Sequence, residues 1–157
     1  MIPEKVRKVL DAHGLAAAEF APGSTATSVL AAQQLGVAVG QIAKSMLFVG
    51  KDGRFFMVVC PGDRRLSSAK LKAATGVKSR MANAEEALGA TGFGPGSVCP
   101  FGIDPEIRVF IDRSLAAYPT IYPAAGTDSS GVPMTFDRLL AITGGTVGEF
   151  LAEVGEG

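Results

Sequence analysis

Residues 91–102, TGFGPGSVCPFG, combine a cysteine with closely spaced glycines and prolines. Such a composition fixes a tight main-chain path and leaves backbone N–H and C=O groups open to a ligand. No Gly-Lys-Ser/Thr follows, which excludes a Walker phosphate loop, and the glycine spacing does not fit a dinucleotide-binding motif. Two interpretations remain open for this segment: the wall of a ligand pocket, and a structural turn.

Cys99 is the candidate nucleophile within that segment, but a reactive thiol needs a base or an electropositive environment. The only histidine, His13, falls at the end of an expected first helix, where a cation beside the helix C-terminus is the simpler role. Cys60 lies in the apolar run FFMVVC and is expected in the core. One histidine and two separated cysteines predict no metal site and no disulfide framework, and nothing else indicates a cofactor.

Lys44 stands in GQIAKSMLFVG, where a turn or helical segment enters an apolar strand. A lysine there either extends to the solvent at the rim or pairs with an anion. The second option makes it a pocket cation for a phosphate or carbonyl oxygen. The sequence AAGTDSS, ending at Ser130, is similarly ambiguous. It forms an ordinary Asx or Ser/Thr turn, or a second loop at the cleft bordered by residues 91–102.

The formal net charge is zero, which argues against a protein that wraps a nucleic-acid duplex. Charge is nevertheless uneven, because residues 63–81 contain six cations and one acid. This segment is either a solvated helix face or a local patch that contacts phosphates at one end of an RNA. In the second interpretation, Arg64, Arg65 and Lys70 are the candidate contacts.

The chain has 157 residues, 47% of them hydrophobic and 19% charged, which predicts one globular domain over residues 1–157. No apolar run reaches the roughly 18 residues of a membrane span. The N-terminus carries acids and lacks a cleavable apolar core, so we expect no secretory signal and a cytoplasmic location. A monomer is favoured over an oligomer.

The elements expected to position these residues mix helices and strands without regular alternation, which predicts an α+β fold. Its sheet is expected to be mixed, largely antiparallel and barrel-like, with helices around it. Helix caps are expected at Ser67 or Ser68, at Asn83 with Glu86 in a capping box, and at Thr135. We expect helices over residues 3–13, 27–36, 69–76, 84–90 and 136–144, and strands over residues 16–20, 45–50, 54–62, 107–112, 119–126 and 131–136.

Four segments together resemble the YbaK-like family, also described as prolyl-tRNA synthetase-associated or aminoacyl-tRNA editing domains. They are STATSVLAAQQLGVAVGQIAKSMLF, TGFGPGSVCPFG, IRVFIDRSL and TIYPAAGTDSSGVPMTFDRLLAITGG, and they span nearly the whole chain in the family's order. The resemblance implies a free-standing hydrolase that removes alanine or cysteine from mischarged proline tRNA. It implies tRNA as the partner, through its acceptor end, with prolyl-tRNA synthetase as a second candidate partner.

The resemblance also implies site residues. Lys44 matches the family's key lysine, Gly102 the glycine after Pro-Phe, and Gly126 the glycine of the closing loop, whereas Thr127–Ser129 occupy the place where some members carry a histidine. Lys44 and Gly102 are thus the expected catalytic residues, with main-chain N–H groups near the two glycines stabilising an oxyanion. The expected substrate-binding residues are Phe20, Ser45, Met46, Phe101, Gly126, Thr127, Asp128 and Ser129.

Two other functions remain open. A non-catalytic module of the same fold could bind tRNA or a synthetase, consistent with the missing histidine. A small-molecule hydrolase could use Cys99 as its nucleophile.

Overall fold

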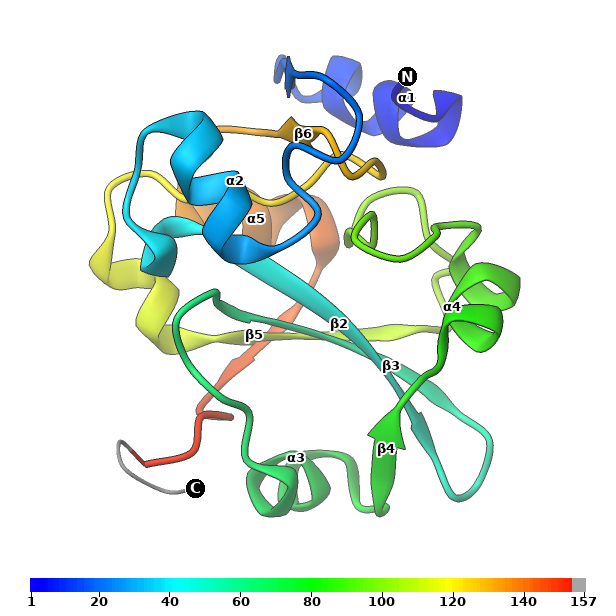
Figure 1. Ribbon diagram of the computed structural model, residues 1–157. Helices are drawn as coiled ribbons and strands as arrows, with labels where there is room; N and C mark the ends of the chain where they lie inside the picture. Colours follow the sequence, from blue (N-terminus) through cyan, green and yellow to red (C-terminus); the bar gives the residue numbers. More distant parts are fainter. Residues whose placement is uncertain (154–157) are drawn as a thin grey trace.

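The computed structural model describes residues 1–153, so the last four residues of the expected domain lie outside the described part of the chain. Its centre is a five-stranded mixed sheet with the strand order β4-β2-β3-β5-β7. Figure 1 shows β2, β3 and β5 crossing the middle of the molecule, with α3 below them and α2 and α5 above. The strands are β2 (Ala43–Gly50), β3 (Phe55–Pro61), β4 (Ser79–Met81), β5 (Arg108–Asp112) and β7 (Thr146–Gly148).

Strand direction divides the sheet into two halves. β2 pairs antiparallel with β3 and with β4, whereas β3–β5 and β5–β7 are parallel. The predicted mixed α+β fold is therefore confirmed. The order of the described strands ends at β4 on one side and β7 on the other, so the sheet is open. It does not close into a barrel, and the expected barrel-like form applies only loosely.

The helices begin where the sequence predicts, because their caps are local. The Asn83 side chain accepts a hydrogen bond from Glu86 N at 2.8 Å, and Glu86 Oε1 accepts one from Asn83 N at 3.0 Å, which completes the capping box. Ser67 and Thr135 also cap their helices. The helices are α1 (Glu4–Ala12), α2 (Ser28–Leu35), α3 (Ser68–Thr75), α4 (Ala84–Thr91) and α5 (Phe136–Thr143), with short 3-10 helices η1 (Val39–Gln41) and η2 (Arg113–Ala117).

The predicted strands over residues 119–126 and 131–136 are largely wrong. Apart from Gly131, which belongs to β6 below, the described residues there form only isolated bridges, between Ile121 and Met134 and between Tyr122 and Ile42. Pro119, Pro123 and Pro133 lack the N–H that a continuous ladder needs. The second sheet consists of two short strands instead, β1 (Ala18–Glu19) and β6 (Ser130–Gly131).

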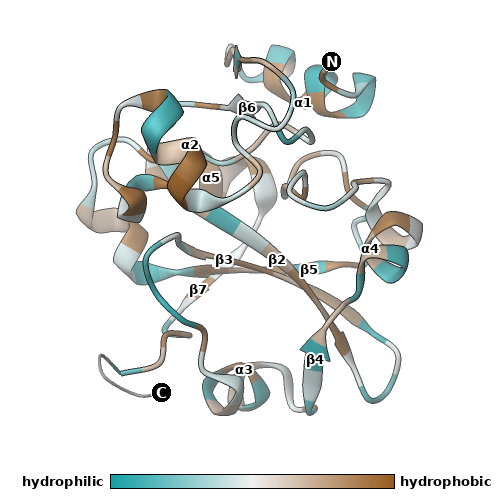
Figure 2. Cartoon of the chain, viewed as in Figure 1, coloured by the Kyte–Doolittle hydropathy of each residue, from teal (hydrophilic) through white to brown (hydrophobic). Residues whose placement is uncertain are grey.

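The core has two main parts, one on each face of the sheet. Alternation along β2 sends Ala43 and Leu47 into a cluster with α1 and α5 residues, and Met46 and Phe48 into a smaller cluster with α3 and Phe150. Figure 2 shows the resulting hydrophobic colouring along the central strands. Neighbouring positions on β2 therefore lie on opposite faces, which decides where Lys44 and Ser45 point.

Candidate functional site

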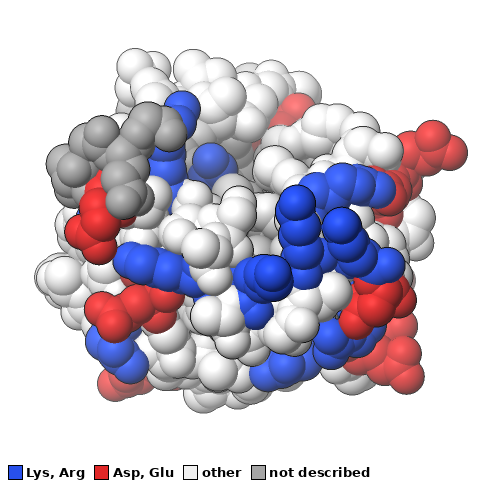
Figure 3. Space-filling model, turned by 90° about the horizontal axis from the view of Figure 1, so that it is seen from below, with Lys and Arg blue, Asp and Glu red and all other residues white. Residues whose placement is uncertain are grey.

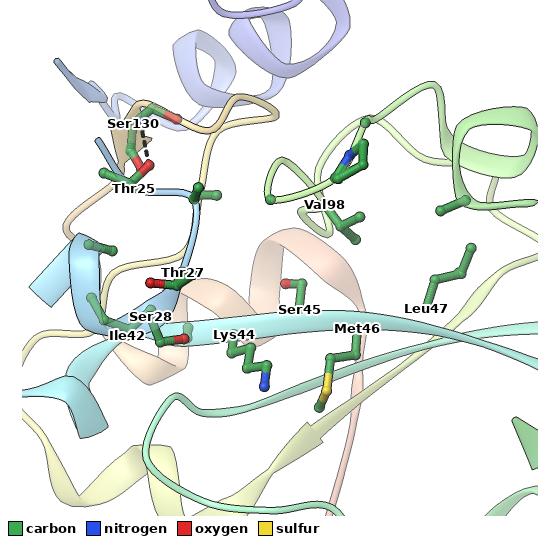
Figure 4. Close-up of a pocket in the computed structure, with 18 of the residues that line it drawn as sticks. Thr25, Thr27, Ser28, Ile42, Lys44, Ser45, Met46, Leu47, Val98 and Ser130 are labelled. Carbon is green, nitrogen blue, oxygen red and sulfur yellow. Dashed lines mark hydrogen bonds between the residues drawn. The ribbon is translucent and has the colours of Figure 1, made fainter. Parts of the chain in front are cut away.

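A cavity of about 390 Å³ lies beside the first half of β2. Four segments form most of its wall: residues 25–28 before and at the start of α2, residues 42–47 before and along β2, residues 81–84 before and at the start of α4, and residues 94–98. Figure 4 shows β2 along the floor, with the segment of Thr27 on one side and the loop of Val98 above. The glycine-rich segment thus contributes a pocket wall through residues 94–98.

Gly96 permits the two loops around the cavity to meet. Its φ is +74°, and a Cβ atom there would lie 3.0 Å from the Ala26 carbonyl oxygen. A left-handed backbone conformation and this close approach both favour glycine. The loop that the sequence marks as unusual therefore closes against the start of α2.

The cavity borders a part of β2 that β4 leaves uncovered. β4 pairs only with Phe48–Gly50, while Ala43 N donates to Tyr122 O and Leu47 O accepts from Ala82 N. Successive residues of a strand direct their N–H and C=O groups toward opposite edges. Ala43 and Leu47 bond on the edge away from β3, so the N–H and C=O of Ser45, midway between them, point toward that same outer edge. Ser45 therefore presents a main-chain donor and acceptor on the side of the strand where the cavity lies.

Side-chain direction separates Lys44 from Ser45. In Figure 4 the Ser45 and Leu47 side chains rise toward the Val98 loop, whereas those of Lys44 and Met46 leave the opposite face of β2. Lys44 is exposed, and the Ser45 Oγ atom is buried. Lys44 is thus a cation at the rim, and Ser45 supplies the polar group inside.

The cavity wall favours a ligand with negative charge. Among the described residues that line it, Lys44 is the only charged side chain. The first turns of α2 and α4 also border the cavity, capped by Thr27 and Asn83, and helix N-termini carry a partial positive charge. Thr27 and Asn83 therefore line the cavity in addition to capping their helices, which the capping motif alone does not reveal.

The predicted loop residues 127–129 lie behind the pocket wall rather than in it. Asp128 holds the loop before α2, because its Oδ1 accepts from Gly23 N at 3.1 Å and its carbonyl accepts from Thr25 N at 2.7 Å. The Thr127 hydroxyl donates to the Ser130 hydroxyl at 2.8 Å, and Ser129 O accepts from Phe20 N. These residues position the pocket-lining Thr25 and Ser130 instead of contacting the cavity.

Gly102 and Gly126 do not line this cavity either; both pack against α1. Gly102 has a φ of +69°, and a Cβ atom there would lie 3.0 Å from the Lys5 carbonyl oxygen. Gly126 has a φ of +80°, and its Cβ atom would lie 2.9 Å from Phe93 Cε1 and 3.1 Å from Val6 Cγ2. Phe101, at 1% exposure, belongs to the core. Of the predicted site residues, the cavity brings together Lys44, Ser45 and Met46.

The predicted tRNA contacts Arg64, Arg65 and Lys70 are away from the cavity wall and hold the C-terminal segment. Arg64 Nη2 donates to Ala152 O at 3.0 Å, Lys70 Nζ donates to Leu151 O at 2.6 Å, and Arg65 O accepts from Ala152 N. Lysine and arginine side chains gather on the face seen in Figure 3, which is the side of α3 and β4 in Figure 1.

Both cysteines are buried outside the cavity wall. Burial raises the pKa of the Cys99 thiol to about 12, and burial together with the nearby Asp112 raises that of Cys60 to about 12. Thiols with such pKa values are not nucleophilic thiolates near neutral pH. This geometry disfavours the cysteine hydrolase.

Sequence reasoning missed most of the pocket wall. The remaining polar side chains of the wall belong to Thr25, Thr27, Ser28, Asn83, Tyr122 and Ser130. Thr27 and Asn83 carry a recognisable capping signal, but only the tertiary arrangement shows that the two capped helix starts meet beside β2.

An open strand edge, two helix starts and a rim lysine surround an apolar-walled cavity in this α+β domain, an arrangement suited to binding a ligand. Residues 23–142 match the aminoacyl-tRNA editing domain family, and the chain belongs to this family. No helix in the described part of the chain combines the length and apolar character needed to cross a membrane.

The chain resembles both free-standing proteins and segments of ligases. It is 37% identical over 112 residues to the uncharacterized protein YwhH of Bacillus subtilis, covering 71% of each chain. It is 44% identical over 85 residues to proline–tRNA ligase of Thermosipho africanus, covering 54% of this chain and only 15% of the ligase. A crystal structure of a candidate trans-editing enzyme for prolyl tRNA synthetase superposes with a TM-score of 0.87 at 35% identity, covering 96% of both chains.

Proposed function

We propose that the chain is a free-standing trans-editing deacylase, which hydrolyses the ester between a wrong small amino acid, such as alanine or cysteine, and proline tRNA. The cavity beside the uncovered edge of β2 carries this proposal. It offers a main-chain N–H at Ser45, a rim cation at Lys44 and a wall of small and apolar side chains. The family and the likeness to a candidate trans-editing enzyme support the same function.

In the proposed reaction, water attacks the ester carbonyl carbon and forms a tetrahedral oxyanion. The C–O bond to the terminal ribose then breaks, the ribose oxygen takes a proton, and the amino acid leaves as a free carboxylate. The Ser45 N–H on the strand edge is the donor best placed for the oxyanion. This assignment replaces the expected N–H donors near Gly102 and Gly126, which pack against α1.

The described cavity wall contains no histidine, cysteine, aspartate or glutamate. We therefore assign no general base to the protein. The neighbouring hydroxyl of the terminal ribose orients the water, accepts a proton from it and passes its own proton to the ribose oxygen that leaves. An aminoacyl ester is already reactive, so positioning and oxyanion stabilisation are the two contributions the pocket makes.

Lys44 suits a phosphate at the cavity rim better than the ester carbonyl inside, because its side chain leaves the face of β2 opposite to Ser45. An exposed ion pair contributes roughly 0.2–1 kcal/mol, which corresponds to about a one-and-a-half- to fivefold effect on kcat/KM. The proposed partner is thus the acceptor end of the tRNA, with prolyl-tRNA synthetase as a second candidate partner.

The test is a deacylation panel with alanine-, cysteine-, serine- and proline-charged proline tRNA. In the presence of wild-type protein, the small wrong amino acids should be released from proline tRNA faster than in buffer alone, whereas the release of proline should not be accelerated. Lys44→Ala should lower kcat/KM, while Lys51→Ala, at the exposed β2–β3 turn, should not. Full activity in Lys44→Ala would contradict its phosphate role. Tight tRNA binding without any release would favour the non-catalytic module.

A further inference from the structure

The Ser45 hydroxyl is a buried polar group without a protein partner. It is the only buried side-chain oxygen or nitrogen in the described residues that has no hydrogen bond. Buried polar side chains are ordinarily paired, so an exception in a native structure calls for an explanation. Its position in the wall of the candidate site suggests that a ligand supplies the missing bond.

Three other hydroxyls around the cavity, those of Thr25, Thr27 and Ser130, already have protein partners, and Ser28 and Tyr122 are only half-buried. Thr25 Oγ1 donates to Ser130 O and accepts from Ser130 N, and Ser130 Oγ accepts from Thr127 and from Ala125 N. Thr27 Oγ1 accepts from Leu30 N as the cap of α2. These three side chains stabilise the wall, whereas the Ser45 hydroxyl remains able to form a hydrogen bond with a ligand in the cavity.

The surroundings of Ser45 indicate which part of an aminoacyl-tRNA would reach its hydroxyl. Its side chain shares a face of β2 with Leu47, and both point toward the loop that carries Val98 (Figure 4). Leu47 is 3% exposed, whereas Lys44 and Thr27 are exposed at the rim. A tRNA end that enters past the exposed residues would bring the aminoacyl side chain, rather than the ribose, to the buried hydroxyl.

We infer that the Ser45 hydroxyl forms a hydrogen bond with the side chain of the aminoacyl group. The site therefore prefers a small amino acid whose side chain carries a hydroxyl or thiol over alanine. This inference rests on the proposed deacylase function and names its substrate class. Serine or cysteine on the tRNA gives Ser45 its hydrogen bond, whereas alanine leaves the hydroxyl unpaired. A site built around a polar contact discriminates against an analogue that lacks the matching group.

The effect should appear as a ratio of kcat/KM values. One neutral hydrogen bond contributes a net factor of about 2 to 12. Wild-type protein should therefore favour serine-charged over alanine-charged proline tRNA, and Ser45→Ala should lower that ratio by about 2- to 12-fold. A thiol is a weaker hydrogen-bonding group than a hydroxyl, so the change for the cysteine-charged tRNA should be smaller.

Ser45→Thr is the matched variant, because it keeps the hydroxyl and suits a β-strand. It should retain more of the serine preference than Ser45→Ala does. Removing an unpaired buried hydroxyl does not remove a protein contact, so Ser45→Ala should unfold at no lower temperature than wild type, a result that calorimetry can check.

The experiment measures single-turnover release from serine-, cysteine- and alanine-charged proline tRNA by wild type, Ser45→Ala and Ser45→Thr. A lower serine-to-alanine ratio in Ser45→Ala, restored in Ser45→Thr, supports the inference. An equal slowing of all three substrates would overturn it and assign Ser45 to a group that the substrates share. No release from any substrate would overturn the deacylase proposal and this inference with it.

Discussion

Replacing Gly126 by alanine tests whether this glycine serves packing rather than chemistry. Gly126 has a φ of +80°, and an added Cβ would lie 2.9 Å from Phe93 Cε1 and 3.1 Å from Val6 Cγ2. The left-handed conformation costs a non-glycine residue roughly 1–2 kcal/mol, and overfilling a packed core adds roughly 1–3 kcal/mol. Gly126→Ala should therefore lower the free energy of unfolding by about 2–5 kcal/mol.

Gly144 provides the matched control. Its φ is +64°, so the conformational cost is similar, but nothing lies within 4 Å of an added Cβ. Gly144→Ala should cost only about 1–2 kcal/mol. Both values come from urea unfolding followed by circular dichroism. If Gly126→Ala lost no more stability than Gly144→Ala, the close packing of residue 126 against α1 would be refuted.

Three further predictions concern helix capping, charge and the thiols. Asn83→Ala removes the cap of α4 and should lower the free energy of unfolding in urea by about 0.5–2 kcal/mol; no loss would contradict the capping box. The Arg80 guanidinium, with the Asn83 N–H, lowers the pKa of Glu86 from 4.5 to about 2, so its contribution to stability is present above pH 4.5 and lost as the pH falls toward 2. Acid unfolding of Glu86→Gln should lack that part of the pH dependence, and an unchanged profile would refute the pairing. Cys60 and Cys99 should resist iodoacetamide in the native protein and react after unfolding, as mass spectrometry would show; rapid native labelling would contradict their burial.

Local signals in the sequence predicted the helices well. Capping at Ser67, Asn83 and Thr135 depends on residues three positions apart, and each cap forms as expected. The three-residue strands β4 and β7 were missed, because so short a strand is defined by its partner rather than by its own sequence. Proline spacing explains why the expected strand over residues 119–126 reduces to isolated bridges.

The candidate site was predictable in part. Lys44 follows from a polar entry into an apolar strand, whereas Ser45 and Met46 were expected from the family resemblance, and all three line the cavity. The glycine-rich segment contributes its wall through residues 94–98, but Gly102 turns out to pack against Lys5. Sequence marks glycines that need a special conformation without showing whether a ligand or another helix approaches them.

The central claim is that ester hydrolysis takes place in the cavity beside β2. Ala84 is an exposed residue of α4 that lines this cavity, whereas Ala74 is exposed on α3 and does not. Tryptophan at either position should leave the fold intact, but only Ala84→Trp should obstruct the cavity. The decisive measurement is single-turnover release of serine and cysteine from proline tRNA by both variants. We predict near wild-type release by Ala74→Trp and release close to the protein-free rate by Ala84→Trp; equal, undiminished release by both would contradict the account.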